Sequence, residues 1–178
     1  MLVILGESAS GKSTVQDILC EKYEFKKLIT YTTREPRKGE INGRDYHYVS
    51  IERFKELLDL GFFCESATYN GWNYGTATED CTNDKVAVLT PHGFRQIKKL
   101  VNVTSFYINV PRRDRLIKIL NRGDNIEEAY RRSLSDVGMF DGIVDEVDFV
   151  INNDEYSKSP IKVAEIIAKN YMYNRTEE

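Results

Sequence analysis

Short apolar runs alternate along the chain with amphipathic segments. Four runs are typical of buried strands, namely Met1–Leu5, Lys85–Leu89, Ser105–Val110 and Phe149–Ile151. Spacing and start signals predict helices from Lys12 to about Tyr23, over Ile51–Leu60 with Ser50 as N-cap, from Pro91 with Thr90 as N-cap, from Pro111, from Asn125 to about Gly138, and from Pro160. Buried strands that alternate with helices predict an α/β fold, in which helices flank both faces of a parallel sheet.

One region interrupts this alternation. An extended stretch over Phe25–Thr33 precedes a polar loop, Arg34–Asp45, which is rich in Gly, Pro and charge. The aromatic segment Phe62–Tyr74 carries turn residues at Asn70-Gly71 and so predicts a β-hairpin. We interpret this hairpin region as a subdomain inserted into the α/β core.

The composition favours one cytoplasmic domain. The chain has 178 residues, about the size of a single domain, and a net charge of −3 that gives no reason to expect nucleic-acid binding. The longest apolar run, Met1–Leu5, is too short for a membrane helix or a signal peptide. The three cysteines form no CxxC pair, so we expect reduced thiols and neither a zinc site nor a disulfide framework.

The segment Gly6–Ser13 fits the phosphate-loop pattern GxxxxGK[ST] between the first strand and the first helix. In such a loop, backbone N–H groups and the helix N-terminus hold phosphate oxygens. Lys12 would reach the β- and γ-phosphates, and Ser13 would ligate magnesium. The pattern therefore predicts a site for a nucleoside triphosphate with Mg²⁺; the alternative is a glycine turn capped by Ser10.

A phosphate loop does not by itself identify the reaction. Hydrolases of this class usually carry an acidic residue at the end of a neighbouring apolar strand, and Val86–Thr90 has none. This disfavours an ATPase or GTPase. A kinase with a small substrate needs a second phosphate site, and Arg34 and Arg37, on either side of Pro36, offer two guanidinium forks for one. On spacing alone, these arginines could equally be solvated loop charges.

The segment Thr32–Ser50, TTREPRKGEINGRDYHYVS, strongly resembles the signature segment of guanylate kinases. With the phosphate loop, the resemblance extends from Gly6 to about Asp154. It implies transfer of a phosphoryl group from ATP to GMP or dGMP, giving ADP and GDP, with Mg²⁺ as cofactor. It also implies a P-loop kinase fold with a parallel core sheet (1–29, 85–115 and 141–178), an inserted mixed subdomain that binds the nucleoside monophosphate (30–84) and a helical lid (116–140).

The resemblance also assigns residues to GMP. The residues that match the family's binding site for the GMP phosphate are Arg34, Arg37, Tyr46 and Tyr74. Glu65 matches the guanine reader, whose carboxylate accepts hydrogen bonds from N1–H and the N2 amine. Thr30 and Thr76 stand where the family usually has serines, and Thr76 would donate to guanine O6. The plainer alternative for Glu65 is an exposed strand carboxylate.

The implied ATP-binding residues are Gly6, Ser8, Ala9, Ser10, Gly11, Lys12, Ser13 and Thr14, with Asn152 against the adenine. Lys12, Arg122 and Arg132 are the implied catalytic residues, because cations that close over the transferring group neutralise its charge. Lys118 replaces a usual arginine of the lid. The alternative for the lid is a solvated basic helix with ion pairs to Glu127 and Glu128.

The chain departs from the family where two aspartates usually flank one apolar residue, since it has Val88 and Thr90 there. We therefore keep two alternatives open. One is a divergent nucleoside monophosphate kinase whose preference extends to dGMP or another base. The other is a catalytically weak module that binds nucleotide or a phosphorylated partner, although Lys12 and Ser13 are intact. The sequence allows a monomer or a homodimer.

Overall fold

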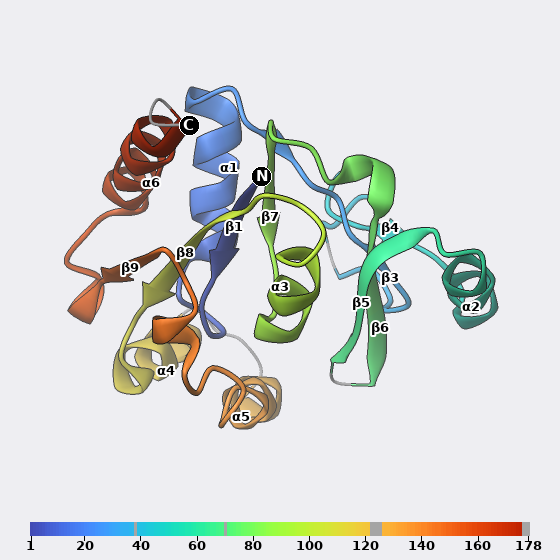
Figure 1. Ribbon diagram of the computed structural model, residues 1–178. Coiled ribbons are helices and arrows are strands. Elements are labelled where there is room, and N and C mark those ends of the chain that lie inside the picture. The colour runs from blue at the N-terminus through green and yellow to red at the C-terminus, as the bar shows by residue number, and fades with distance from the viewer. Residues whose placement is uncertain (38, 70, 122–125, 176–178) are drawn as a thin grey trace.

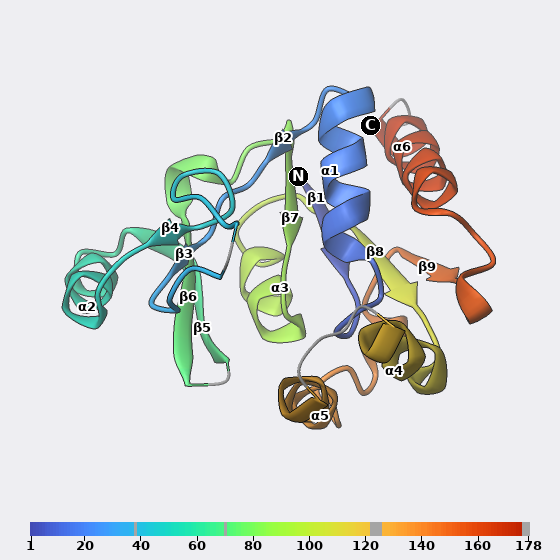
Figure 2. The ribbon, with the colours of Figure 1, turned by 180° about the vertical axis from the view of Figure 1, so that it is seen from behind.

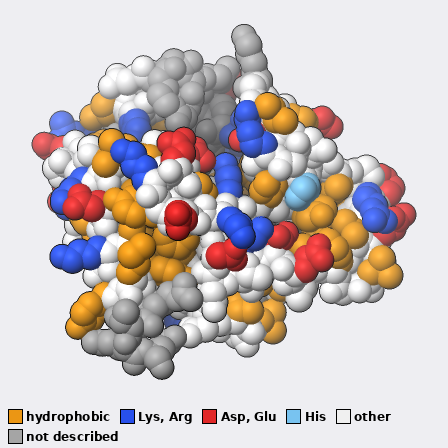
Figure 3. Space-filling view, turned by 90° about the horizontal axis from the view of Figure 1, so that it is seen from above, with side chains coloured by type: hydrophobic (Ala, Val, Ile, Leu, Met, Phe, Trp, Pro, Cys, Tyr) orange, Lys and Arg blue, Asp and Glu red, His pale blue; other side chains and the backbone are white. Residues whose placement is uncertain are grey.

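The computed structural model describes residues 1–37, 39–69, 71–121 and 126–175. Its elements form two sheets that lie side by side, with helices around them (Figure 1). Among the described residues, no helix combines the length and the apolar character needed to cross a membrane. Acidic and basic side chains are interspersed over the face seen from above (Figure 3).

The first sheet has five parallel strands, in the order β2-β7-β1-β8-β9. Their bounds are Lys26–Lys27 for β2, Lys85–Val88 for β7, Leu2–Leu5 for β1, Thr104–Asn109 for β8 and Phe149–Asn152 for β9. Strand β1 is central and buried throughout, as expected for a strand that is covered on both faces. The prediction of a parallel α/β core is thereby confirmed.

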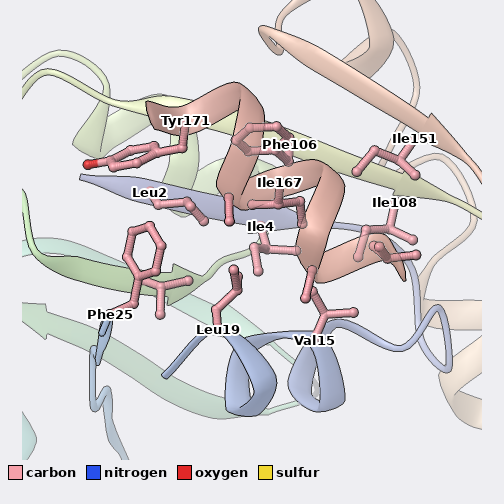
Figure 4. Close-up of a cluster of buried hydrophobic side chains, with 14 of the residues drawn as sticks. Leu2, Ile4, Val15, Leu19, Phe25, Phe106, Ile108, Ile151, Ile167 and Tyr171 are labelled. Carbon is pink, nitrogen blue, oxygen red and sulfur yellow. The ribbon is translucent and has the colours of Figure 1, made fainter. Parts of the chain in front are cut away.

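Helices cover both faces of this sheet because side chains of β1 alternate between them. Leu2 and Ile4 belong to one buried cluster, which packs against α1 (Lys12–Lys22) and α6 (Pro160–Arg175). Figure 4 shows side chains of these two helices pointing toward Leu2 and Ile4. Val3 and Leu5 belong to the other cluster, with α3 (Pro91–Ile97) and the short helix η2 (Ile143–Asp145).

The second sheet is mixed, with the order β4-β3-β6-β5. Its strands are β3 (Tyr31–Thr32), β4 (His47–Tyr48), β5 (Phe63–Tyr69) and β6 (Trp72–Ala77), and α2 (Ile51–Asp59) lies beside it. The expected β5–β6 hairpin is present. The expected extended stretch 25–33 instead divides, because β2 pairs with the core strand β7 whereas β3 pairs with β6.

Helices α4 (Arg112–Asn121) and α5 (Ile126–Ser135) lie at the bottom of the molecule in Figures 1 and 2. The short helix η1 (Thr78–Asp80) directly follows β6, and the short helix η3 (Asp154–Tyr156) follows β9. In both views α5 lies between α4 and the far end of the β5–β6 hairpin.

Two predicted helix starts are confirmed. The Ser50 hydroxyl accepts a hydrogen bond from the Arg53 N–H at the start of α2, and the Thr90 hydroxyl accepts one from the Gly93 N–H at the start of α3. Each hydroxyl thus satisfies a backbone donor that has no partner within the helix. The expected start at Asn125 lies outside the described residues.

Candidate active site

A cleft of about 410 Å³ separates the loop between β1 and α1 from the second sheet. It brings together most of the residues that the sequence singled out. Those lining it are Gly6, Ser8, Ala9, Gly11, Lys12, Ser13, Thr14, Thr30, Arg34, Arg37, Tyr46, Glu65 and Tyr74. Positions far apart in the chain therefore share one cavity, with a phosphate loop on one wall and arginines and tyrosines on the other.

The phosphate loop depends on its first glycine for its shape. Gly6 has φ +153°, and a Cβ at this position would lie 2.6 Å from Ser10 Oγ and 2.9 Å from the Ile108 carbonyl oxygen. A side chain at position 6 would therefore force the loop away from β8. Gly11, with φ +97°, is the N-cap of α1, in a left-handed conformation that glycine adopts at no steric cost.

Lys12 projects into this cleft at the start of α1. Its ammonium donates a hydrogen bond to the Glu7 carbonyl oxygen at 2.8 Å. Burial lowers the pKa of Lys12 to about 8, although Asp136 and Glu7 oppose this shift. A bound polyanion would supply the negative charge that favours the protonated amine.

A buried ionic network lies beneath the loop. Asp136 accepts hydrogen bonds from the Ser8 backbone N–H at 2.9 Å and the Ser8 hydroxyl at 3.3 Å. Arg115 pairs with Asp136 at 3.3 Å and with Glu7 at 3.5 Å, and the Tyr107 hydroxyl also donates to Glu7. This network fixes the loop to α4 and to the segment after α5. The sequence interpretation gave Arg115 no role, because nothing in its local pattern shows a partner 21 residues away.

On the opposite wall, Arg34 is held in a fixed orientation. It is only 5% exposed, and one nitrogen donates to both carboxylate oxygens of Glu40, at 2.9 and 3.0 Å. The other nitrogen donates to the Glu35 carbonyl oxygen, and the guanidinium lies 5.2 Å from the centre of the Tyr46 ring. Tyr48 also donates to Glu40. Glu40 thus positions the arginine, a role that sequence reasoning missed although Glu40 lies within the quoted segment.

Glu65 is buried, with 4% of its surface exposed, so the alternative of an exposed strand carboxylate is wrong. The Thr76 hydroxyl donates to Glu65 Oε1 at 2.6 Å. Burial raises the pKa of Glu65, and the hydrogen bond from Thr76 opposes that shift. Thr76 itself is fully buried and is not among the residues that line the cleft.

Helix α3 holds the neighbourhood of Glu65 in place. The Gln96 side chain accepts a hydrogen bond from the Ser66 N–H at 3.0 Å and donates one to the Ser66 carbonyl oxygen at 3.2 Å. These two bonds fix β5 to α3 one residue beyond Glu65. Val88 and Thr90 also line the cleft, and the Thr90 hydroxyl is already used as the cap of α3.

A second cavity, of about 580 Å³, lies on the far side of the phosphate loop, next to Ser10 and Gly11. The Lys118 ammonium lies 4.0 Å from the centre of the Tyr156 ring, and the Tyr156 hydroxyl donates to the Ala9 carbonyl oxygen. Asn153 lines this cavity, whereas its neighbour Asn152 is exposed at the end of β9 and accepts a hydrogen bond from Asn109.

The lid cations are less completely described. Arg122 lies outside the described residues, and Arg132 is described only as a residue of α5. Arg131, which the sequence interpretation did not select, lines the cleft and lies 5.4 Å from the Trp72 ring at the end of the hairpin. A cation of α5 thus contacts the opposite wall of the cleft.

Comparison with known proteins agrees with this geometry. The family model described as guanylate kinase matches residues 1–170. The chain belongs to the guanylate kinase family. Among its relatives, guanylate kinase of Trichormus variabilis is 36% identical over 165 residues, covering 88% of this chain and 83% of the relative. Guanylate kinase of Nitratidesulfovibrio vulgaris is 38% identical over 144 residues, covering 76% and 70%.

The fold agrees with a solved member of the same family. The crystal structure of guanylate kinase from Anaplasma phagocytophilum superposes with a TM-score of 0.74 at 24% identity, covering 98% of this chain and 85% of that one. This likeness confirms the predicted parallel core with a second mixed sheet. The family resemblance read from the phosphate loop and the segment Thr32–Ser50 is confirmed by the family match.

Proposed function

We propose that this chain transfers the γ-phosphoryl group of ATP to GMP, giving ADP and GDP. One observation carries the proposal: a single cleft holds a phosphate loop on one wall and, on the other, a fixed arginine beside a buried carboxylate. The first wall suits a nucleoside triphosphate, and the second suits a phosphate joined to a base that offers hydrogen-bond donors. Membership of the guanylate kinase family supports the same assignment.

The triphosphate would lie along the loop 6–14, with its charge facing Lys12. The nucleoside would extend into the second cavity, where Lys118, Tyr156 and Asn153 form the wall. The proposed contact of Asn152 with adenine stays a prediction. Asn153 lines the cavity, so we place the base closer to it than to Asn152.

The acceptor would place its phosphate against Arg34, Arg37, Tyr46 and Tyr74. Its base would face Glu65, whose carboxylate would accept from the guanine N1–H and N2 amine. Adenine has no donor at N1, so it would leave this buried carboxylate with only the hydrogen bond from Thr76, and such mispairing is costly. Because Glu40 already fixes Arg34, part of the ordering cost is met before the substrate binds.

Transfer of this kind depends on alignment of the two substrates and on neutralisation of charge. Lys12 would stabilise the negative charge that develops on the transferring group. The cations of the lid, Arg122 and Arg132, are proposed to do the same. Arg131 already lies in the cleft opposite Trp72, so α5 is placed to cover the substrates and exclude water.

The residues present fit Mg²⁺ as a cofactor. Magnesium is usually held by one or two protein oxygens together with substrate phosphates and water. Ser13, next to Lys12 in the cleft, offers a hydroxyl oxygen of this kind, and the described residues contain no separate cluster of three acidic, His or Cys side chains. When bound, the metal ion would neutralise charge on the β- and γ-phosphate oxygens.

The test is ADP formation from magnesium-ATP with GMP, dGMP, AMP, CMP and UMP in parallel. We expect strong use of GMP or dGMP and loss of most activity in Lys12→Ala, which removes one phosphate contact and leaves the fold intact. Preference for another monophosphate would keep the kinase and overturn the base assignment. Nucleotide binding without transfer to any acceptor would favour the binding module instead.

A further inference from the structure

Cys64 and Cys81 form a thiol pair that the proposed reaction does not use. Their sulfur atoms lie 2.6 Å apart, although 17 residues separate them in the chain. Cys64 belongs to β5, and Cys81 directly follows η1 in the connection that leads to the core strand β7. Both residues are half-buried and pack at the edge of the second core cluster.

Cys64 occupies an irregular position in its strand. Phe63 pairs with Ala77 and Glu65 pairs with Thr76, so two steps along β5 correspond to one step along β6. Cys64 is therefore the extra residue of a β-bulge, and a bulge re-aims the side chains beside it. The side chain directly after the bulge is Glu65, the proposed guanine reader.

The two thiols have different chemistry. The contact between them lowers the pKa of the Cys81 thiol and raises that of the Cys64 thiol. Burial, Glu65 and Asp80 oppose the shift at Cys81, whereas the N-terminal ammonium assists it. Cys81 is thus the better nucleophile of the pair, with a second thiol already in contact with it.

We propose that Cys64 and Cys81 form an intrachain disulfide by exchange with a low-molecular-weight disulfide. The Cys81 thiolate attacks one sulfur of that disulfide, breaks its S–S bond and releases one thiol. Cys64 then attacks Cys81 Sγ in the mixed disulfide and expels the second thiol. Two cysteine thiols are oxidised, one external disulfide is reduced, and the two cysteine protons end on the two thiols released.

This bond would act on the acceptor side of the cleft. It would join the bulge of β5 to the connection between the second sheet and the core, and so restrain the backbone on which Glu65 stands. The effect on GMP rests on the proposed function. We expect oxidation to raise the KM for GMP about tenfold, since small displacements of a positioning group cost this much or more, while the KM for ATP stays unchanged.

The bond itself can be tested without any activity measurement. The variant Cys20→Ser keeps only Cys64 and Cys81, so a disulfide in it has one possible pairing. After treatment with oxidised glutathione, we expect this variant to lose the mass of two hydrogen atoms and to regain it with dithiothreitol. The double variant Cys20→Ser/Cys64→Ser should instead keep one glutathione on Cys81, because no second thiol can release it. Two free thiols remaining in Cys20→Ser would overturn the proposal.

Kinetics of the same oxidised Cys20→Ser protein then test the effect on the site. A GMP KM that rises on oxidation and recovers with dithiothreitol supports control of the acceptor side, with Cys64→Ser/Cys81→Ser as the insensitive control. If the disulfide forms and the KM for GMP stays unchanged, the proposed effect of oxidation on the acceptor side is overturned. If the reduced protein phosphorylates no monophosphate, the proposed function fails, whereas the mass measurement still decides the disulfide.

Discussion

Gly93 on α3 and Glu65 on β5 are in such close contact that a Cβ on Gly93 would lie 2.7 Å from Glu65 Oε2. The glycine does not serve a turn, because it lies inside a regular helix. Alanine in a helix interior is usually more stable than glycine by about 1 kcal/mol. The helix therefore accepts the weaker residue where a buried carboxylate needs the space.

Gly93→Ala should impair the acceptor site while leaving the chain folded. The added methyl group would displace the Glu65 carboxylate from its place beside Thr76. We expect the KM for GMP to rise at least about tenfold. The KM for ATP should change little, because the proposed ATP site lies on the opposite wall of the cleft. Steady-state kinetics with each substrate varied in turn would measure this, and a thermal melt would check the fold.

A double-mutant cycle separates this effect from general damage. If Gly93→Ala acts only through the carboxylate, it should raise the KM for GMP little further once Glu65→Gln is present. The effects of substitutions at residues in contact are generally not additive. If the effects of Gly93→Ala and Glu65→Gln are fully additive, Gly93→Ala acts through a group other than the Glu65 carboxylate.

Glu65→Gln should weaken selection of guanine over adenine. A hydrogen bond to a charged group contributes about 1.5–3 kcal/mol, so the ratio of kcat/KM for GMP to that for AMP should fall roughly 10- to 150-fold. The substitution keeps the size of the side chain, and the amide can still accept from Thr76. Unchanged selectivity in a panel of monophosphates would show that the base is read elsewhere.

ATP binding should take up protons near pH 8 through Lys12. The pKa of this amine is lowered from 10.5 to about 8 in the free protein, so at pH 8 about half of the molecules carry it neutral. Bound phosphates favour the charged amine and raise its pKa again. Affinity for ATP should therefore decrease as the pH rises above 8.

Calorimetry in two buffers of different ionisation enthalpy would measure this uptake, with about half a proton expected at pH 8. Lys12→Met keeps the chain of methylene groups and removes the amine, so uptake should disappear in it. Equal uptake in both proteins would assign the proton to another group.

Trp72 should report occupation of the cleft. It is the sole tryptophan of the chain, it lines the cleft, and Arg131 of α5 lies over its ring. We expect its fluorescence to change when ATP and GMP bind together, because α5 would move relative to the hairpin. Arg131→Met should shift the Trp72 emission of the free protein and reduce the fluorescence change on binding. Identical fluorescence titrations of both proteins would show that the signal does not depend on the contact between Arg131 and Trp72.

Local patterns accounted for most of the elements and for the phosphate-loop wall of the cleft. The spacing of glycines and Lys12 specifies a phosphate loop, and Ser50 and Thr90 mark helix starts, because these signals depend on residues a few positions apart. The family resemblance supplied Arg34, Tyr46 and Glu65, which the structure then brought into one cavity. The boundaries of core, inserted region and lid, and the cytoplasmic location, stay predictions.

Contacts between distant positions were the part that the sequence did not reveal. Asp136 binds the Ser8 N–H across 128 positions, and neither the phosphate-loop pattern around Ser8 nor the sequence around Asp136 shows that the two residues meet. The contact between Cys64 and Cys81 could not be predicted from local sequence either. It depends on the bulge at Cys64, and that bulge follows from how β5 and β6 align. Such relationships follow from strand register and packing, which local periodicity does not encode.

The place of β1 at the centre of the first sheet has a consequence for how the chain folds. Leu2 pairs with Val86 and Thr104, which follow it by 84 and 102 positions in the chain. The middle of the sheet therefore closes only when these distant segments meet. Contacts this distant in sequence form slowly, and until then the apolar residues Leu2–Leu5 have to stay protected from association with other chains.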